Sequence, residues 1–402
     1  MFQQHAGKRN LSIMWFGNFF VSGSMTMVLP FISLYIDSFG NFTEEYVQHW
    51  SGITFGVTFV TAFIFSPIIG RLGDRYGRKK ILTFMAFGMG LSMFLLGYAS
   101  TVWELFLLRM FMGFFSGFIP VSQAMISTQT PKECAGRILG TLQTGTITGS
   151  LFGPLLGGAL ADAFGYAATF QSTSVLIILS GILVLFVKEY RIDIKQGAKI
   201  AYTRKEVLLH MLRNPVLMNV LMISMLVQVA HFSIQPILSL YVGELHGMDN
   251  IAFYSGIAFS AAGLGNLLMA RKWGEIADRA GYIKILVVLL IISAIVYLPG
   301  AFVTNVWQLV IIRFALGMTL GGIIPVRIAY IRHEAPVAMQ GEVLGYNTSL
   351  RFLGNIIGPV LGGFLSGWFG FGSVFFATSA LLLVSGIILF MSMHRHPQLA
   401  GN

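Results

Sequence analysis

The chain has 402 residues, of which 55% are hydrophobic and only 10% are charged. Soluble domains carry about 25% charged residues, so this chain cannot cover itself with polar surface, and lipid must be its solvent. Its formal net charge of +10 would suit a protein that binds nucleic acid, but the positions of the charges along the chain exclude that interpretation. The single cysteine, Cys134, excludes an internal disulfide framework.

Apolar segments of about 20 residues, the length that crosses a bilayer, recur along the whole chain. The first follows Lys8 and Arg9 without the cleavage site of a signal peptide. We predict an all-α integral membrane protein whose twelve transmembrane helices cover residues 11–36, 50–70, 81–99, 103–127, 137–161, 166–187, 214–241, 252–272, 283–303, 305–328, 341–366 and 371–391.

Charged residues divide between the two sides of this arrangement. Lys and Arg occupy both termini and every second loop, whereas the loops of the other side carry acids and neither Lys nor Arg. The positive-inside rule then places both termini in the cytoplasm. The excess of Lys and Arg over Asp and Glu therefore reflects membrane topology, so membrane lipid is an expected partner and nucleic acid is not.

The first charged motif is the hinge, Gly70–Lys80, between the second and third spans. Gly73 and Gly77 allow a sharp turn and close helix approach, while Asp74 at the membrane interface is costly unless paired. A pairing made in only one conformation would act as a latch, and a static basic turn explains the motif equally well. The residues assigned to this motif are Gly70, Gly73, Asp74, Arg75, Gly77 and Arg78.

The hinge returns in eroded form at Gly274–Lys284. Asp278 and Arg279 follow Asp74 and Arg75 by 204 residues, as 278 − 74 and 279 − 75 show. Other motifs repeat in the same direction at spacings of 204 to 206 residues: Trp103 with Trp307, Arg109 with Arg313, Gly153-Pro154 with Gly358-Pro359, and Pro30 with Pro236. Such a parallel repeat indicates two similar halves related by an axis along the membrane normal.

The longest polar segment separates six spans from six. We predict an N-terminal six-helix bundle at 1–190, a cytoplasmic linker at 191–213 and a C-terminal six-helix bundle at 214–402. Part of the linker, near Thr203 to Leu212, is a candidate amphipathic helix on the membrane surface.

The fifth span is rich in glycine at four-residue spacing. Such glycines make a smooth helix face that allows close packing, and Pro154 removes one backbone hydrogen bond and permits a bend. The residues of this motif are Gly149, Gly153, Pro154, Gly157 and Gly158.

Several spans contain polar residues that point to coupling or binding. A cation in hydrocarbon costs at least about 2.5 kcal/mol, so Arg109 should face the protein interior, although snorkelling to the interface is an alternative. Arg313, its repeat partner, and Arg351 in span eleven are further candidates, whereas Arg327 lies close enough to the cytoplasmic end to be an anchor.

A proton carrier is harder to identify, because no acid lies in the middle of a predicted span. Asp37, at the outer end of the first span, is the best acidic candidate, followed by Asp162 and Glu104, and each also suits an ordinary interface position. His231 titrates near neutrality and is an alternative carrier, although a hydrogen-bonded interior histidine explains it too.

Enzyme chemistry finds no support in the chain. It contains no Walker sequence, no metal-ligand cluster and no Ser/His/Asp arrangement in a supporting context. We therefore expect no enzyme activity, no cofactor and no metal.

Two of these motifs resemble known signatures. Gly70-x-x-x-Asp74-Arg75-x-Gly77-Arg78-Lys79 resembles the sequence between helices 2 and 3 of the major facilitator superfamily. Gly149-x-x-x-Gly153-Pro154-x-x-Gly157-Gly158 resembles the antiporter motif of its drug:proton exchangers. Over nearly its whole length the chain is similar to the twelve-helix drug:proton antiporters of that superfamily.

The resemblance implies the major facilitator fold and proton-coupled efflux of small amphipathic or aromatic compounds, including cationic dyes and quinolones, by alternating access. It implies a monomer in the bacterial inner membrane, with a cytoplasmic gate at Asp74 and Arg78 that is weaker at Asp278. By family analogy spans 1, 4, 7 and 10 line the cavity, and the candidate lining residues are Asn18, Met25, Gln123, Gln228, Gln235, Arg313 and Arg351.

Two other functions remain open. A dedicated exporter or flippase for one endogenous solute or lipid would have the same architecture. A non-transporting membrane receptor or scaffold is the alternative from a different class, and the two intact glycine-rich halves argue against it.

Overall fold

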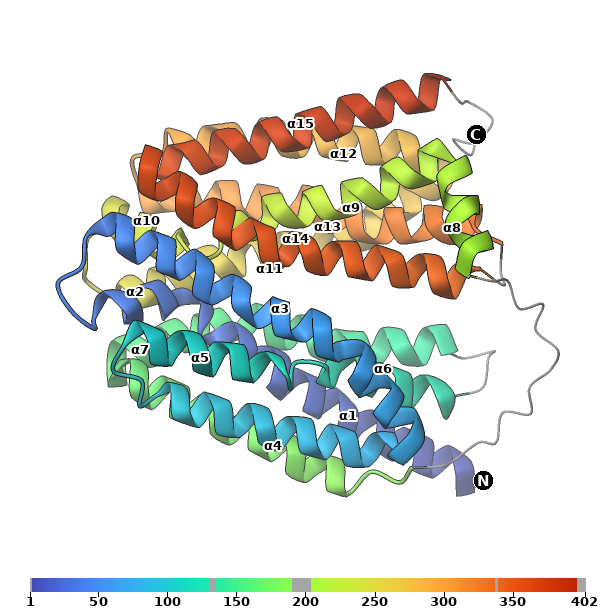
Figure 1. Cartoon of the computed structure of the whole chain (residues 1–402), viewed down its shortest axis with the longest axis horizontal. Coiled ribbons are helices and arrows are strands. Elements are labelled where there is room, and N and C mark those ends of the chain that lie inside the picture. Colours follow the sequence, from blue (N-terminus) through green and yellow to red (C-terminus); the bar gives the residue numbers. More distant parts are fainter. Residues whose placement is uncertain (1, 131–134, 190–203, 337–338, 396–402) are drawn as a thin grey trace. The chain divides into compact units, whose positions relative to one another are not determined.

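A computed structural model describes residues 2–130, 135–189, 204–336 and 339–395 (Figure 1). These residues are mostly helical, and none of the described residues lies in a strand. Contacts divide the chain into two compact units.

Unit 1 comprises Met1–Thr43, Ile53–Ile194 and Leu238–Ser260. Its helices are α1 (Phe2–Met27), η1 (Leu29–Phe31), α2 (Ile32–Asp37), most of α3 (Glu44–Tyr76), α4 (Arg78–Leu96), α5 (Val102–Gly113), α6 (Phe118–Thr128), α7 (Ala135–Leu185), α10 (Leu238–His246) and the beginning of α11 (Ile251–Ala280).

Unit 2 comprises Glu44–Gly52, Lys195–Ile237 and Ala261–Asn402. It contains the first turns of α3, the remainder of α11, and α8 (Arg204–Arg213), α9 (Pro215–Ser233), α12 (Tyr282–Tyr297), η3 (Leu298–Ala301), α13 (Val306–Glu334), α14 (Gln340–Phe369) and α15 (Phe371–Arg395). Each unit thus includes a short segment from the other half of the sequence. The predicted bundles at 1–190 and 214–402 stay a prediction.

Eleven helical stretches among the described residues are long and apolar enough to cross a membrane. One of them, Ile138–Leu185, contains Gly165 with φ 83° and ψ 168°, which is not a helical conformation and favours glycine. Two predicted spans therefore meet at Gly165. Gly370 adopts nearly the same conformation between α14 and α15, with φ 78° and ψ 168°, 205 residues further on.

Three spans that the sequence analysis treated as continuous are interrupted. The first breaks around Pro30, which lacks a backbone N–H and begins a 3₁₀ turn before α2. The fourth divides into α5 and α6 at residues 114–117, where short-range turns replace the α-helical ladder. The seventh ends its helix α9 at Ser233, just before Pro236, and resumes as α10.

The predicted helix in the linker is present as α8. Val207 and Met211, one turn apart, are buried, whereas Leu208, Leu209 and Leu212 are exposed. Elsewhere large apolar side chains remain on the surface of the spans; Phe84 in α4 and Phe390 in α15, for example, are 65% and 46% exposed. This distribution suits helices whose outer faces meet lipid.

Candidate functional site

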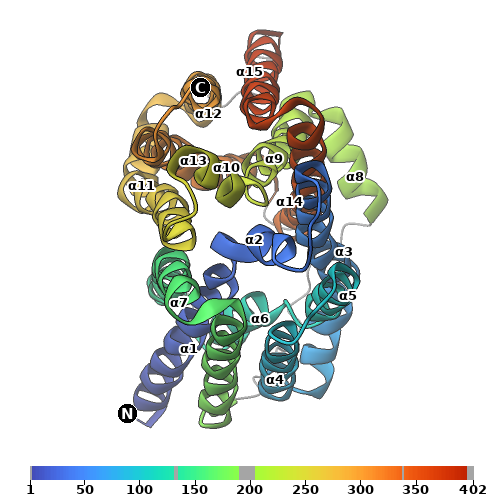
Figure 2. The same ribbon diagram turned by 90° about the vertical axis from the view of Figure 1, so that its left-hand side faces the viewer.

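The glycine ladder of α7 packs directly on the backbone of α1. A Cβ added at Gly149 would overlap the Phe19 carbonyl oxygen, and one at Gly157 would overlap that of Met27. Gly153 similarly meets the Gly23 carbonyl, at 2.5 Å from an added Cβ. Figures 1 and 2 show the two helices side by side. Only glycine allows this close approach, so the predicted packing role is confirmed.

Unit 2 repeats this contact between α14 and α9. A Cβ at Gly354 would lie 2.5 Å from the Met225 carbonyl oxygen, and one at Gly358 would lie 2.7 Å from that of Val229. Gly354 and Met225 follow Gly149 and Phe19 by 205 and 206 residues, which are the offsets of the sequence repeat. The ladder is therefore a structural element of both halves, and an antiporter role for it stays a prediction.

The end of the motif contacts the first turns of α11 within unit 1. A Cβ at Gly158 would overlap the Ala252 carbonyl oxygen. One helical turn further along, the Asp162 carboxylate accepts hydrogen bonds from the backbone N–H groups of Ala252, at 3.3 Å, and Phe253, at 2.8 Å. Asp162 thus caps the N-terminus of α11, where free N–H groups favour an anion.

The hinge joins α3 to α4 through Gly77, whose φ of 101° favours glycine. The Arg78 guanidinium donates hydrogen bonds to the Ala124 carbonyl oxygen and, at 2.9 Å, to the Thr128 hydroxyl, so it ties α4 to the end of α6. Arg75 lies over the Tyr76 ring, 5.3 Å from its centroid.

A carboxylate that the sequence analysis did not identify caps this hinge. Glu189, just beyond the sixth span, accepts hydrogen bonds from the backbone N–H groups of Arg78, at 2.6 Å, and Lys79, at 3.3 Å. A Cβ at Gly77 would lie 2.9 Å from the Glu189 carboxylate, so glycine also makes room for the cap. The only sequence signal was an acid directly after a span in a mainly basic segment.

The remaining hinge residues are placed less specifically. Gly73 is buried and accepts the backbone hydrogen bond of Gly77 at 3.1 Å. Gly70 has open space where a side chain would be. The side chain of Asp74 lies outside the described part of the structure, so its predicted latch role stays a prediction.

The second copy of the hinge has different contacts. Asp278 accepts a hydrogen bond from the Tyr282 hydroxyl at 2.9 Å, and Tyr282 stands where the first copy has Arg78. Asp278 and Arg279 are both exposed. His394 occupies the position 205 residues after Glu189, and its ring nitrogen lies 3.1 Å from the carbonyl oxygen of Phe390 on its own helix. A histidine therefore stands where the first hinge has its capping carboxylate.

Arg109 lies in the interior of unit 1, as expected, with 4% of its side chain exposed. Its guanidinium carbon is 5.6 Å from the centroid of the Phe55 ring, a cation–π distance. Its Nε atom is buried and has no hydrogen-bond partner among the described residues. Burial argues against snorkelling, and a coupling role stays a prediction.

The other predicted cavity residues of unit 1 lie on α1 and on α6. Asn18 is fully buried, and neither of its amide atoms has a hydrogen-bond partner in the described part of the chain. Met25, two turns along α1, is partly buried. Gln123 donates a hydrogen bond to Gln143 at 2.7 Å, and both line a pocket of about 450 Å³ between α6 and α7.

Unit 2 brings four of the predicted residues together: His231 on α9, Gln235 just beyond its end, Arg313 on α13 and Arg351 on α14. His231 lies 3.3 Å from the Gln235 amide nitrogen and within electrostatic reach of Arg313 and Arg351. Gln228, on α9, donates a hydrogen bond to Asn355 at 2.8 Å.

Arg327 and Asp37 are two further charged residues for which the sequence suggested a role. The interface-anchor expectation for Arg327 is wrong, since only 1% of this side chain is exposed. Asp37, the last residue of α2, is exposed. It therefore does not lie in the interior with Arg109, and its suggested role as proton carrier stays a prediction.

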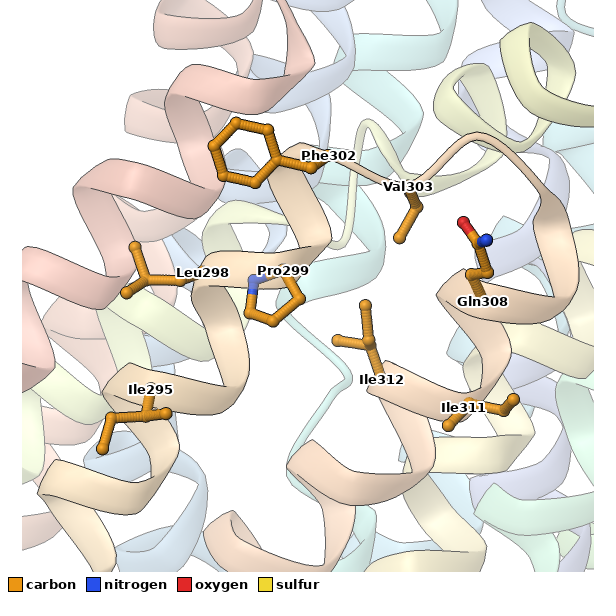
Figure 3. A pocket seen from close by; sticks show the side chains of 8 residues that line it. All are labelled: Ile295, Leu298, Pro299, Phe302, Val303, Gln308, Ile311 and Ile312. Atoms are coloured by element: carbon orange, nitrogen blue, oxygen red, sulfur yellow. The ribbon is translucent and has the colours of Figure 1, made fainter.

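A larger pocket, of about 700 Å³, lies at the ends of α12 and α13 and contains none of the predicted residues (Figure 3). Its walls are apolar apart from Gln308, and Phe302 and Ile311 are 71% and 67% exposed. Figure 3 shows these side chains around an open groove between the two helices. Because such an exposed apolar groove suits acyl chains, we do not assign it as the transport site.

The fold and these motifs define a class of protein. The family model for the Major Facilitator Superfamily matches residues 14–288 and 254–402. The chain therefore belongs to the major facilitator superfamily. It is a multi-pass membrane transporter and not an enzyme.

Individual relatives cover almost the whole chain. An uncharacterized MFS-type transporter, YuxJ, of Bacillus subtilis is 51% identical over 94% of this chain and 97% of its own. The multidrug resistance protein MdtG of Dickeya zeae is 38% identical over 96% of this chain and 95% of its own. A solved bacterial homologue of the human lysosomal transporter Spinster has a TM-score of 0.81 at 14% identity, covering 100% of this chain and 98% of its own.

Proposed function

We propose that this transporter exports small amphipathic or aromatic compounds from the bacterial cytoplasm in exchange for protons, by alternating access. It would act as a monomer in the inner membrane with both termini in the cytoplasm. The main support is the similarity to MdtG proteins, which are named for multidrug resistance and match 96% of the chain.

The interior of unit 1 suits such substrates. Arg109 and Asn18 are buried polar side chains in largely apolar surroundings, and Gln123 lines a pocket. A mostly apolar site with a few polar groups binds amphipathic molecules by burial and orients them by hydrogen bonds. Partly buried methionines such as Met25 add an adaptable apolar surface.

The hinge supports a gate at the cytoplasmic side. Arg78 holds the end of α6, and Glu189 holds the beginning of α4, so three helices of unit 1 are connected at one point. In this proposal Asp74 completes the latch when the inner side is closed. Proton exchange would involve Arg109, His231 or Asp37.

Counterflow in liposomes with an imposed pH gradient tests this function. Purified protein should accumulate several chemically unrelated amphipathic dyes against their gradients only when the proton gradient is present, and a protonophore should abolish the accumulation. A response to one compound alone would instead identify a dedicated exporter. Absence of any proton-dependent flux across the panel would refute multidrug antiport.

A further inference from the structure

Unit 2 contains a row of buried arginines that the proposed function does not use. Arg313 and Arg327 lie 14 residues apart on α13, close to four helical turns, so they occupy the same face about 21 Å apart. Arg351 of α14 acts electrostatically on Arg327 and, with Arg313, on His231 of α9. The row consists of Arg313, Arg351 and Arg327, and His231 is a neighbour of the first two.

The arginines of this row are withdrawn from water. Arg313 and Arg327 are each 1% exposed, and Arg351 is mostly covered. A guanidinium has five N–H donors and keeps its charge in proteins. Burying such a group is costly unless an anion or several acceptors compensate it.

For Arg327 and Arg351 that compensation is missing within the described chain. All three side-chain nitrogens of Arg327 and the Nε of Arg351 are buried without a hydrogen-bond partner among the described residues. Neither arginine forms an ion pair with an acid in that part of the protein. Glu334, two turns beyond Arg327, instead accepts a hydrogen bond from Asn214 at 2.7 Å.

The acids of unit 2 lie near the ends of helices or in the helix α8. They are Glu44, Glu45, Glu206, Glu275, Asp278, Glu334 and Glu342. Neutral amides lie on the same helices as Arg351 and His231, or just beyond their ends. Asn355 follows Arg351 by one turn and accepts from Gln228 at 2.8 Å, and the Gln235 Oε1 atom is buried without a partner in the described structure.

The sequence repeat shows that the fold does not require these charges. Positions equivalent to Arg327 and Arg351 in unit 1 are Ser122 and Thr146, both 205 residues earlier. The position equivalent to His231 is Met25, 206 residues earlier. Because the same helix packing forms around neutral residues in unit 1, helix packing does not account for the cations of unit 2.

We infer that unit 2 binds an oxyanion between Arg327 and Arg351, and that this oxyanion is the carboxylate or phosphoryl group of a transported amphipathic compound. Two guanidinium groups match such oxygen atoms with charge-assisted hydrogen bonds. The substrate class is then anionic amphiphiles, in place of the cationic dyes expected from resemblance. This inference rests on the proposed export function, but the oxyanion site itself is tested by binding and stability, which do not require transport.

Three dansyl compounds with similar apolar bodies provide the probe. Dansylglycine carries a carboxylate, dansylglycinamide is neutral and dansylcadaverine carries an ammonium group. Binding is followed by dansyl fluorescence in phosphatidylcholine nanodiscs. Dansylglycine should bind at least about tenfold more tightly than the other two compounds, because one charge-assisted hydrogen bond contributes at least that factor to the affinity. Equal affinity for all three would overturn the inference.

Variants identify the residues responsible. Arg351→Gln and Arg327→Gln should each remove the preference for dansylglycine, and Arg351→Lys should retain part of it. Arg332→Gln, at an exposed position on α13, is the matched control and should bind all three probes like the wild type. A preference that survives both glutamine variants would place the anion elsewhere.

The melting temperature distinguishes a ligand-binding role of Arg327 from a structural role, because the two roles predict opposite changes when Arg327 is replaced. If Arg327 is kept for ligand binding, Arg327→Gln should leave the melting temperature of the ligand-free protein unchanged or raise it. Dansylglycine should stabilise the wild type but not this variant. A large destabilisation of the ligand-free variant would show that Arg327 has a structural partner, and would refute the inference.

A lipid headgroup has the same phosphoryl chemistry, so nanodiscs containing phosphatidylglycerol separate the two sources. Unchanged dansylglycine affinity assigns the site to solutes. Weaker dansylglycine affinity in phosphatidylglycerol nanodiscs, seen with the wild type and the control Arg332→Gln but not with Arg351→Gln, assigns the site to lipid and overturns the transported-solute inference. Proton-driven efflux of neutral dyes without an anion preference would refute the oxyanion site alone; an anion preference without any efflux would refute only the export function.

Discussion

The glycine ladder provides the sharpest test of how α7 and α1 pack. Gly157→Ala places a Cβ against the Met27 carbonyl oxygen, which is backbone and cannot rotate away. Overpacking of this kind costs about 1–3 kcal/mol. Alanine in a helix also gains up to about 1 kcal/mol over glycine, so that gain must be subtracted.

Gly140→Ala is the matched control on the same helix. A Cβ at Gly140 meets nothing within 4 Å, so this variant shows the propensity gain without the overlap. The difference between the two variants removes the propensity contribution and leaves about 1–3 kcal/mol for the clash alone. Gly362→Ala, which would overlap the Ser233 carbonyl oxygen in unit 2, should behave like Gly157→Ala.

Reversible unfolding in mixed detergent, followed by tryptophan fluorescence, measures these differences. We expect Gly140→Ala to be at least as stable as the wild type and Gly157→Ala to be less stable. If Gly157→Ala unfolds at the same detergent fraction as Gly140→Ala, the α1–α7 contact is looser than described and the packing argument is refuted.

Three further predictions concern single side chains. Glu189→Ala should lower the free energy of unfolding by about 1 kcal/mol, the usual value of a helix cap, whereas the exposed Glu244→Ala should not; equal unfolding curves would contradict the cap. Asp74→Asn should abolish dye efflux while the protein remains in the membrane, and normal efflux would remove the latch role. Arg109→Ala should lose proton-driven transport in liposomes, and full activity would reduce Arg109 to a packing residue.

Much of the architecture follows from local sequence alone. Apolar length and the one-sided placement of Lys and Arg predict the spans because a bilayer imposes both constraints on every segment independently. The repeat offsets of 204 to 206 residues relate the halves, and the structure preserves them in the glycine contacts of Gly149 and Gly354. The interruption of the first span near Pro30 was not predicted, because the apolar sequence continues through it.

Tertiary structure decided which distant residues meet. Nothing local connects Glu189 with the beginning of α4, since the two are joined only when the sixth span returns to the same end of unit 1. Arg327 looked like an interface anchor because its distance from the end of a span is visible in sequence, whereas its burial depends on the helices packed around it. Periodicity assigns a residue to a face of a helix, but the partner of that face, and therefore the cost of an unpaired charge there, exists only in the folded chain.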